Sequence, residues 1–323
     1  MRLTTYFFAI MAVLGLFACV GPSTANADIV PQIYWTDITP GTSGSGSIMR
    51  ANADGTGVQT LVSGLSHPRG MAVDVAGGEM YWAEPGRLAV RRADLDGNNV
   101  QTVIPDGQNG TSGVALDTTN GKMYWTGWTT PWGGPGADIR QANLDGSGSQ
   151  ELVTVGLARP VGIAVDTLHG KMYWTDLDGN YDGTGEIRRA NLDGSNVETL
   201  LTGVSVDEVN GIALDVSGDR MYWPEIATHK IYSAHLDGSV VTPLVEGLEN
   251  PTTIALDLLA GKMYWTNGWD GGSNNMIQRA NLNGTGVETF LSGVGLPWGI
   301  AITPEPATLL LLTLGGLMVL RRR

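Results

Sequence analysis

The residues best suited to catalysis are spread along the chain without a recognisable arrangement. The one cysteine, Cys19, lies in an apolar N-terminal run, and no Gly-x-Ser-x-Gly sequence is present to mark a serine nucleophile. The histidines lie in different copies of an internal repeat, without the spacing of metal ligands: His67, His169, His229 and His235. The sequence therefore predicts a protein that is not an enzyme.

One segment has the residue pattern of a calcium-binding loop. Asp178, Asn180 and Asp182 alternate with other residues, a glycine follows, and Glu186 lies close behind. Alternating side-chain oxygens ahead of a glycine open the calcium loops of helix–loop–helix proteins, so these four residues are candidate metal ligands. Arg189 stands in place of the usual glutamate at position twelve, and Asp, Asn and Gly also suit any loop. No cofactor is expected, with calcium at this loop as the alternative.

Aromatic residues lie in or beside the long glycine-rich segments, where binding residues of rigid proteins concentrate. Flat rings on such loops can stack on sugars or anchor a protein partner. The alternative is that they fold back and cap the elements below them. The candidate ligand-binding residues are these aromatics and two arginines that precede apolar strands: Trp128, Trp132, Tyr181, Trp269, Trp298, Arg69 and Arg159.

The elements that must position these residues are set by an internal repeat. A Tyr-Trp pair recurs six times, with 42 to 49 residues between successive tyrosines. Each copy has four short strand-like segments, for example at residues 162–166, 171–175, 187–192 and 197–201. An Asp-Gly or Asn-Gly pair separates the third and fourth segments of all six copies, as in a tight hairpin. Four strands in a repeat of this length indicate one blade of a β-propeller.

The repeat is offset against the chain ends. The first copy begins at its second strand, residues 32–36, and the last copy is followed by a lone first strand, residues 298–302. Pairing that strand with the first three would complete a sixth blade from both ends of the chain. The ring would then have no open sheet edge.

The motif copies read YWTD, YWAE, YWTG, YWTD, YWPE and YWTN. They resemble the YWTD repeat of the low-density lipoprotein receptor class B family over roughly residues 31–302. The resemblance implies an all-β fold, a six-bladed β-propeller of YWTD type closed by its N- and C-terminal strands. The departures at the fourth motif position matter little for the fold if that side chain only supports turns between blades.

Three functions remain open for such a propeller. The first is an exported, monomeric binding or scaffold module that recognises a protein or a polysaccharide through its loop face. The second is a metal-dependent lactonase or lyase, but of the residues entering the first strands only Asn210, near Asp207 and Glu208, suits the channel of such an enzyme. The third is a purely structural matrix protein.

Residues 1–27 have the pattern of a secretory signal peptide. Arg2 supplies a positive start, an apolar run follows, and Ala25-Asn26-Ala27 is a small-x-small cleavage site. The apolar run is shorter than the roughly 20 residues that span a bilayer. Lipidation at Cys19 is an alternative, although bulky Phe17 disfavours it. Residues 28–303 then form the propeller.

Residues 304–323 resemble the PEP-CTERM sorting signal. They comprise Pro304-Glu305-Pro306, the apolar stretch Ala307 to Leu320, and a terminal arginine cluster. The resemblance implies cleavage by an exosortase-type enzyme after transient contact of a short transmembrane segment with the inner membrane. The expected location is therefore the surface or extracellular matrix of a bacterial cell.

The charge of the chain excludes one class of partner. The formal net charge is -13, with 16% charged residues and 46 glycines. An acidic body repels phosphate backbones, so nucleic acid is not an expected ligand.

Overall fold

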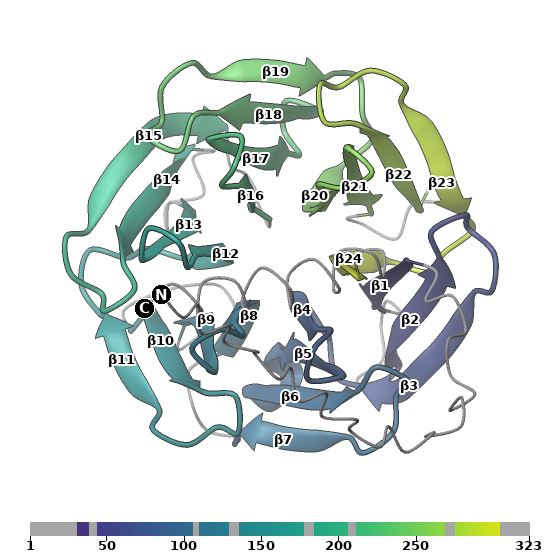
Figure 1. Ribbon diagram of the computed structural model, residues 1–323, viewed down its shortest axis with the longest axis horizontal. Coiled ribbons are helices and arrows are strands. Elements are labelled where there is room, and N and C mark those ends of the chain that lie inside the picture. Colours follow the sequence, from purple (N-terminus) through teal and green to yellow (C-terminus); the bar gives the residue numbers. More distant parts are fainter. Residues whose placement is uncertain are drawn as a thin grey trace, which may run out of the picture.

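The computed structural model describes residues 31–38, 44–105, 110–128, 136–177, 184–205, 211–268 and 275–303. Within them, 24 strands form six four-stranded antiparallel sheets, which stand as blades around a central axis (Figure 1). The predicted six-bladed β-propeller is confirmed. The predicted signal peptide and C-terminal sorting segment lie outside the described residues and stay predictions. No helix in the described part of the chain has the length and apolar character needed to cross a membrane.

The four strands of each blade are arranged from the axis to the rim in the order in which they are named here (Figure 1). Blade 1 contains β24 (Pro297–Thr303), β1 (Gln32–Asp37), β2 (Gly46–Asn52) and β3 (Gln59–Leu65). Blade 2 contains β4 (Met71–Asp74), β5 (Glu79–Glu84), β6 (Ala89–Asp94) and β7 (Gln101–Ile104), with the 3-10 helix η1 (Pro85–Arg87) between β5 and β6. Blade 3 contains β8 (Gly110–Asp117), β9 (Lys122–Trp128), β10 (Asp138–Asn143) and β11 (Gln150–Val153).

The other three blades repeat this order. Blade 4 contains β12 (Pro160–Asp166), β13 (Lys171–Leu177), β14 (Thr184–Asn191) and β15 (Glu198–Ser205). Blade 5 contains β16 (Ala213–Asp215), β17 (Arg220–Glu225), β18 (Lys230–Ala234) and β19 (Thr242–Val245). Blade 6 contains β20 (Pro251–Asp257), β21 (Lys262–Asn267), β22 (Met276–Asn281) and β23 (Glu288–Ser292).

Blade 1 is built from both ends of the chain, as the offset of the repeat predicts. β24 pairs antiparallel with β1, and Gln32 lies opposite Thr303. The backbone N–H of Gln32 also donates to Thr303 Oγ1 at 2.9 Å. The pairing covers the inner edge of β1 and closes the ring (Figure 1).

The Tyr-Trp pair builds the cores between blades. Neighbouring residues of a strand point to opposite sheet faces, so the two rings enter different cores. Tyr34 of blade 1 packs with Trp82 of blade 2, and Tyr264 of blade 6 packs with Trp35 of blade 1. Every tyrosine and tryptophan of the six pairs is at most 3% exposed. One dipeptide per repeat therefore supplies both halves of a continuous ring of cores.

The threonine after the pair joins neighbouring first strands. Thr126 Oγ1 accepts the Gly113 N–H of its own blade at 2.9 Å and donates to the Val161 carbonyl of the next blade at 2.7 Å. Thr266 donates in the same way to the Trp298 carbonyl of blade 1, at 2.8 Å. One hydroxyl thus satisfies a donor and an acceptor that the close approach of two strands leaves without ladder partners.

In blades 1 and 4 the residue at the fourth motif position holds the segment that enters the first strand. Asp37 accepts the N–H groups of Gly295 and Leu296, each at 3.0 Å, and Asp176 accepts those of Ala158 and Arg159 at 3.1 and 2.8 Å. The role expected of this residue, supporting the turns between blades, is confirmed in these blades.

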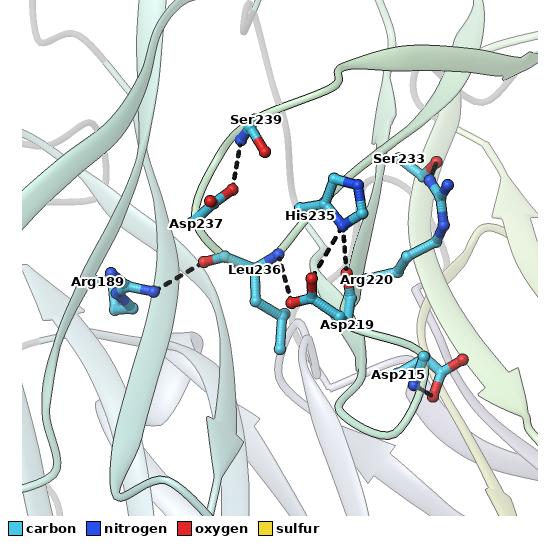
Figure 2. Close-up of polar contacts among 10 residues, drawn as sticks. Arg189, Asp215, Asp219, Arg220, Ser233, His235, Leu236, Asp237 and Ser239 are labelled. Carbon is cyan, nitrogen blue, oxygen red and sulfur yellow. Dashed lines mark hydrogen bonds and ion pairs between the residues drawn. The ribbon is translucent and has the colours of Figure 1, made fainter.

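We call the end of the propeller with the β-hairpin turns the turn face. There Arg189 of blade 4 donates to the Leu236 carbonyl of blade 5 at 2.9 Å, and Asp237 accepts the Ser239 N–H at 2.8 Å (Figure 2). Gly238 has φ +85°, and a Cβ there would approach the Leu200 carbonyl of blade 4 to 2.8 Å. The glycine of the hairpin is therefore needed for both its conformation and its contact with the preceding blade.

The turn aspartates should make stability depend on acid pH. The hydroxyl and then the backbone N–H of the residue two positions later lower the pKa of Asp54, Asp145, Asp193 and Asp237. The Asn98 backbone N–H and side-chain amide lower the pKa of Asp96. A folded-state pKa below the unfolded value stabilises the fold above about pH 4, and this stabilisation is lost as the pH falls through the folded-state pKa.

We expect replacement of the five aspartates by asparagine to flatten the loss of melting temperature between pH 5 and pH 3. Asn283 already fills this position in blade 6 and accepts the Thr285 N–H at 3.1 Å, so the amide can make the turn. Asn283→Asp is the matched reverse variant and should steepen the loss. Parallel pH–melting curves for all three proteins would contradict the assignment.

Candidate binding face

The loop face, opposite the turn face, is where chain segments enter the first strands and where second strands end. Two of the candidate residues precede glycines that line the central channel: Arg69 precedes Gly70, and Trp298 precedes Gly299. Trp128 ends β9, and Arg159 directly precedes β12. These four residues come from the first four blades and meet at the mouth of the channel.

We call them the mouth cluster. The Arg69 guanidinium carbon lies 4.9 Å from the ring centroid of Trp298 and 5.8 Å from that of Trp128. The Arg159 guanidinium carbon lies 5.6 Å from the same Trp128 ring. Guanidinium groups over indole rings are attracted to the negative ring face, by about 2 kcal/mol or more where water is excluded. The rings therefore hold two cations in position at the mouth of the channel.

The structure corrects the prediction that the rings of Trp128 and Trp298 are open for stacking on a ligand. Trp128 is 2% exposed and Trp298 is 6% exposed, so neither ring offers an open face for stacking on a ligand. For these two residues the alternative holds: they fold back and pack at the blade tops, under the arginines. Trp132, Tyr181 and Trp269 lie outside the described residues. A ligand-binding role for the whole set stays a prediction.

The cavity in the central channel is small, and its wall is mostly apolar. A cavity of about 60 Å³ on the axis is lined by a glycine and one larger residue from each of five blades and by two larger residues from blade 6: Gly70, Met71, Gly113, Val114, Gly162, Ile163, Gly211, Ile212, Thr253, Ile254, Gly299 and Ile300. Among the described lining residues, Thr253 alone has a polar side chain. Asp207, Glu208 and Asn210, on which the lactonase alternative depends, lie outside the described residues.

A larger cavity, of about 340 Å³, opens in blade 4. We call it the blade 4 pocket, lined by Gly156, Ala158, Asp176, Gly185, Glu186, Thr202 and Gly203. Asp176 is 4% exposed, and burial raises its pKa. The Asp176 Oδ2 atom lies 3.2 Å from Arg188 Nη1, and Glu186 Oε2 lies 3.5 Å from Arg188 Nε. Arg188 therefore lies between two carboxylates.

Of the predicted calcium ligands, only Glu186 lies within the described residues. Its carboxylate contacts Arg188 and accepts the Thr199 hydroxyl at 3.1 Å. Asp178, Asn180 and Asp182 lie outside them. No three His, Cys, Asp or Glu side chains gather as a metal site in the described ranges. Calcium binding stays a prediction.

The histidines do not all lie in different repeats, which corrects that expectation. His229 and His235 both belong to blade 5, before and after β18, and so lie on opposite faces. Nδ1 of His235 lies 2.9 Å from Asp219 Oδ2 on the turn face (Figure 2), and Nδ1 of His229 lies 2.9 Å from the Leu248 carbonyl oxygen.

The sequence motifs did not identify Asp176, Thr202 and Arg188 as site residues. Comparison of equivalent positions in the six repeats is the signal that could have identified them.

The fold and motif together define the class of protein: a six-bladed β-propeller with YWTD-type repeats. The family model described as low-density lipoprotein receptor repeat class B matches residues 32–75, which contain the first motif copy. Nidogen-2 from Mus musculus is 35% identical over 75 residues, 23% of this chain and 5% of that protein. Protein cueball from Drosophila grimshawi is 35% identical over 77 residues, 23% of this chain and 12% of that protein. The chain thus spans a small part of the length of both relatives.

Solved structures show the same fold over most of the chain. A chain of a nidogen/laminin complex has a TM-score of 0.69 and 21% identity, covering 84% of this chain and 98% of its own. TolB from Acinetobacter baumannii has a TM-score of 0.65 and 14% identity, covering 86% of this chain and 68% of its own. At these identities the likeness concerns the fold.

Proposed function

We propose that this propeller is an exported binding module that holds a protein partner on its loop face, with a carboxylate of the partner at the mouth cluster. The observation that carries the proposal is the placement of Arg69 and Arg159 over the Trp128 ring, beside the channel. A guanidinium group presents a planar set of donors that matches a carboxylate. Arginines anchored on tryptophans are typical of the residues that dominate binding energy at interfaces.

The local charge supports an acidic ligand group. The chain as a whole carries a formal charge of -13, so a pair of arginines at the channel mouth is locally distinct. Two guanidinium groups held together favour binding of a carboxylate. A protein partner also agrees with the fold relationship, because one similar structure is a nidogen/laminin complex.

Export and surface retention are part of the same proposal. They rest on the signal-peptide pattern of residues 1–27 and on the sorting-signal pattern of residues 304–323. The propeller itself acts as a monomer outside the inner membrane. Processing by an exosortase-type enzyme releases the apolar tail.

The test is binding of the full-length protein to defined acidic probes. We expect an array of Asp- and Glu-containing peptides to show binding that weakens at least about tenfold in the double variant Arg69→Gln, Arg159→Gln, since each substitution removes a guanidinium group that contacts a tryptophan ring. Lys230→Gln is the matched control, because Lys230 lies on the loop face in an exposed ion pair with Glu246.

Two outcomes would overturn this proposal. One is the absence of binding to every acidic peptide. The other is equal binding by the double variant and the unchanged protein. Uronic-acid oligosaccharides are tested beside the peptides, and binding confined to these oligosaccharides would show that the partner is a polysaccharide and not a protein.

A further inference from the structure

The six blades differ at one pair of positions on the loop face. In every blade, the fourth motif residue lies on the second strand, directly opposite one residue of the third strand. The pairs, in blade order, are Asp37 and Ser47, Glu84 and Ala89, Gly127 and Asp138, Asp176 and Glu186, Glu225 and Lys230, and Asn267 and Met276. Only the blade 4 pair places two carboxylates opposite each other.

Two like charges opposite each other on neighbouring strands destabilise a sheet unless a cation lies between them. In blade 2 the carboxylate of Glu84 pairs with two arginines, Arg87 at 2.9 Å and Arg91 at 3.1 Å. In blade 3 Arg140 pairs with Asp138 at 2.7 Å and with Glu151, an exposed residue of the outer strand, at 2.6 Å. In blade 4 a single arginine, Arg188, contacts both Asp176 and Glu186. Among these three side chains the carboxylates exceed the guanidinium group by one, and both carboxylates line the blade 4 pocket.

The shape of the blade 4 pocket also suits a ligand. Its volume of about 340 Å³ is within the range of small-molecule sites, about 300–1,000 Å³. Three of its lining residues are glycines, and nothing lies within 4 Å of the position that a Cβ of Gly203 would occupy. Asp176 is buried in its wall, whereas Glu186 is 40% exposed and reachable from solvent.

We infer that the blade 4 pocket binds the ammonium or guanidinium group of a lysine or arginine side chain from a protein partner. This inference rests on the proposed function, because it adds a second, oppositely charged contact to the same face. The incoming cation contacts Glu186 and the Thr202 hydroxyl and balances the excess charge. The aliphatic part of the side chain lies against Ala158 and the glycines.

The first test uses Nα-acetyl-lysine N-methylamide as the probe, with its norleucine analogue as the neutral control, in titrations of the full-length protein. We expect the lysine probe to bind, with affinity that falls as salt is added, and the norleucine probe not to bind. Equal binding of the two probes, or binding of neither, would overturn the inference.

Variants localise the binding. Glu186→Gln should weaken the lysine probe about threefold to fivefold, because it removes one partly exposed charge. Thr202→Lys should nearly abolish binding, because Thr202 is the cross-strand partner of Glu186 and a tethered ammonium would occupy the pocket. Glu198→Gln is the matched control in the same blade, since Glu198 pairs with Arg189 away from the pocket. An equal loss in the Glu198 variant would overturn the assignment.

Two further measurements separate this inference from its alternatives. In the first, calcium is added to the protein with the lysine probe bound. If calcium displaces the probe, and raises the melting temperature of the unchanged protein but not of Glu186→Gln, the ligand of the pocket is a metal ion and not an organic cation. The variant Arg69→Gln, Arg159→Gln should still bind the lysine probe. If the unchanged protein binds the lysine probe but no acidic peptide, only the role proposed for the mouth cluster is overturned. If it binds acidic peptides but not the lysine probe, only the role inferred for the blade 4 pocket is overturned.

Discussion

A chain that ends before Pro297 is expected to lose cooperative unfolding and to aggregate, whereas a chain that ends after Thr303 keeps the full melting transition. The deletion removes β24, in which Trp298 and Ile300 are each 6% exposed. Burial of a large apolar side chain contributes about 1.5–3 kcal/mol, so the loss approaches the 5–15 kcal/mol that stabilises a typical protein. It also exposes the inner edge of β1 for pairing with other chains.

Thermal melting and light scattering of the two chains measure this effect. The chain ending after Thr303 is the control, since it lacks the same tail but keeps β24. Equal melting temperatures for the two chains would show that closure by the chain ends does not hold the ring together.

The second large effect is expected at Glu84, whose side chain is fully buried. It accepts the Ser66 N–H at 2.7 Å and pairs with Arg87 at 2.9 Å and with Arg91 at 3.1 Å. Glu84→Ala should destabilise the propeller by about 3–5 kcal/mol, because it leaves a mostly buried guanidinium group of Arg91 without its carboxylate.

Chemical denaturation provides the measurement for Glu84, with two comparison variants. Glu84→Gln keeps an acceptor for the Ser66 N–H and should lie between Glu84→Ala and the unchanged protein. Glu151→Ala removes an exposed carboxylate that pairs with Arg140, and it should cost about 1 kcal/mol or less. Equal effects of Glu84→Ala and Glu151→Ala would show that the fourth motif position contributes little to stability.

The repeat made the scaffold predictable because each of its signals acts locally. Tyr-Trp pairs fill opposite faces of one strand, and Asp-Gly pairs fit the hairpin turns. The strand predicted at residues 171–175 is β13 (Lys171–Leu177), and the lone strand predicted at residues 298–302 is β24 (Pro297–Thr303). The boundaries of these two strands moved by one or two residues. The segments predicted at residues 187–192 and 197–201 are β14 (Thr184–Asn191) and β15 (Glu198–Ser205), which extend three and four residues further at their loop-face ends, since register with the neighbouring strand decides where pairing ends.

The binding face could be predicted only in outline. The sequence located Arg69, Trp128, Arg159 and Trp298 near strand ends, and these residues do meet at the channel mouth. It did not predict that arginines cover the rings, because ring exposure depends on side chains from four different blades. The sequence pattern places Glu186 in a local calcium loop. The charged groups near its carboxylate, however, are Asp176 and Arg188, which the pairing of strands brings to it.

The sequence by itself determined the number of blades, their strand order and the closure of the ring. These follow from patterns of period two and from a repeat in which every copy buries its face against the next. Only the tertiary structure decided which charges share a site, because Coulomb interactions depend on distances between residues far apart in the chain. The mouth cluster and the blade 4 pocket both arise at that level.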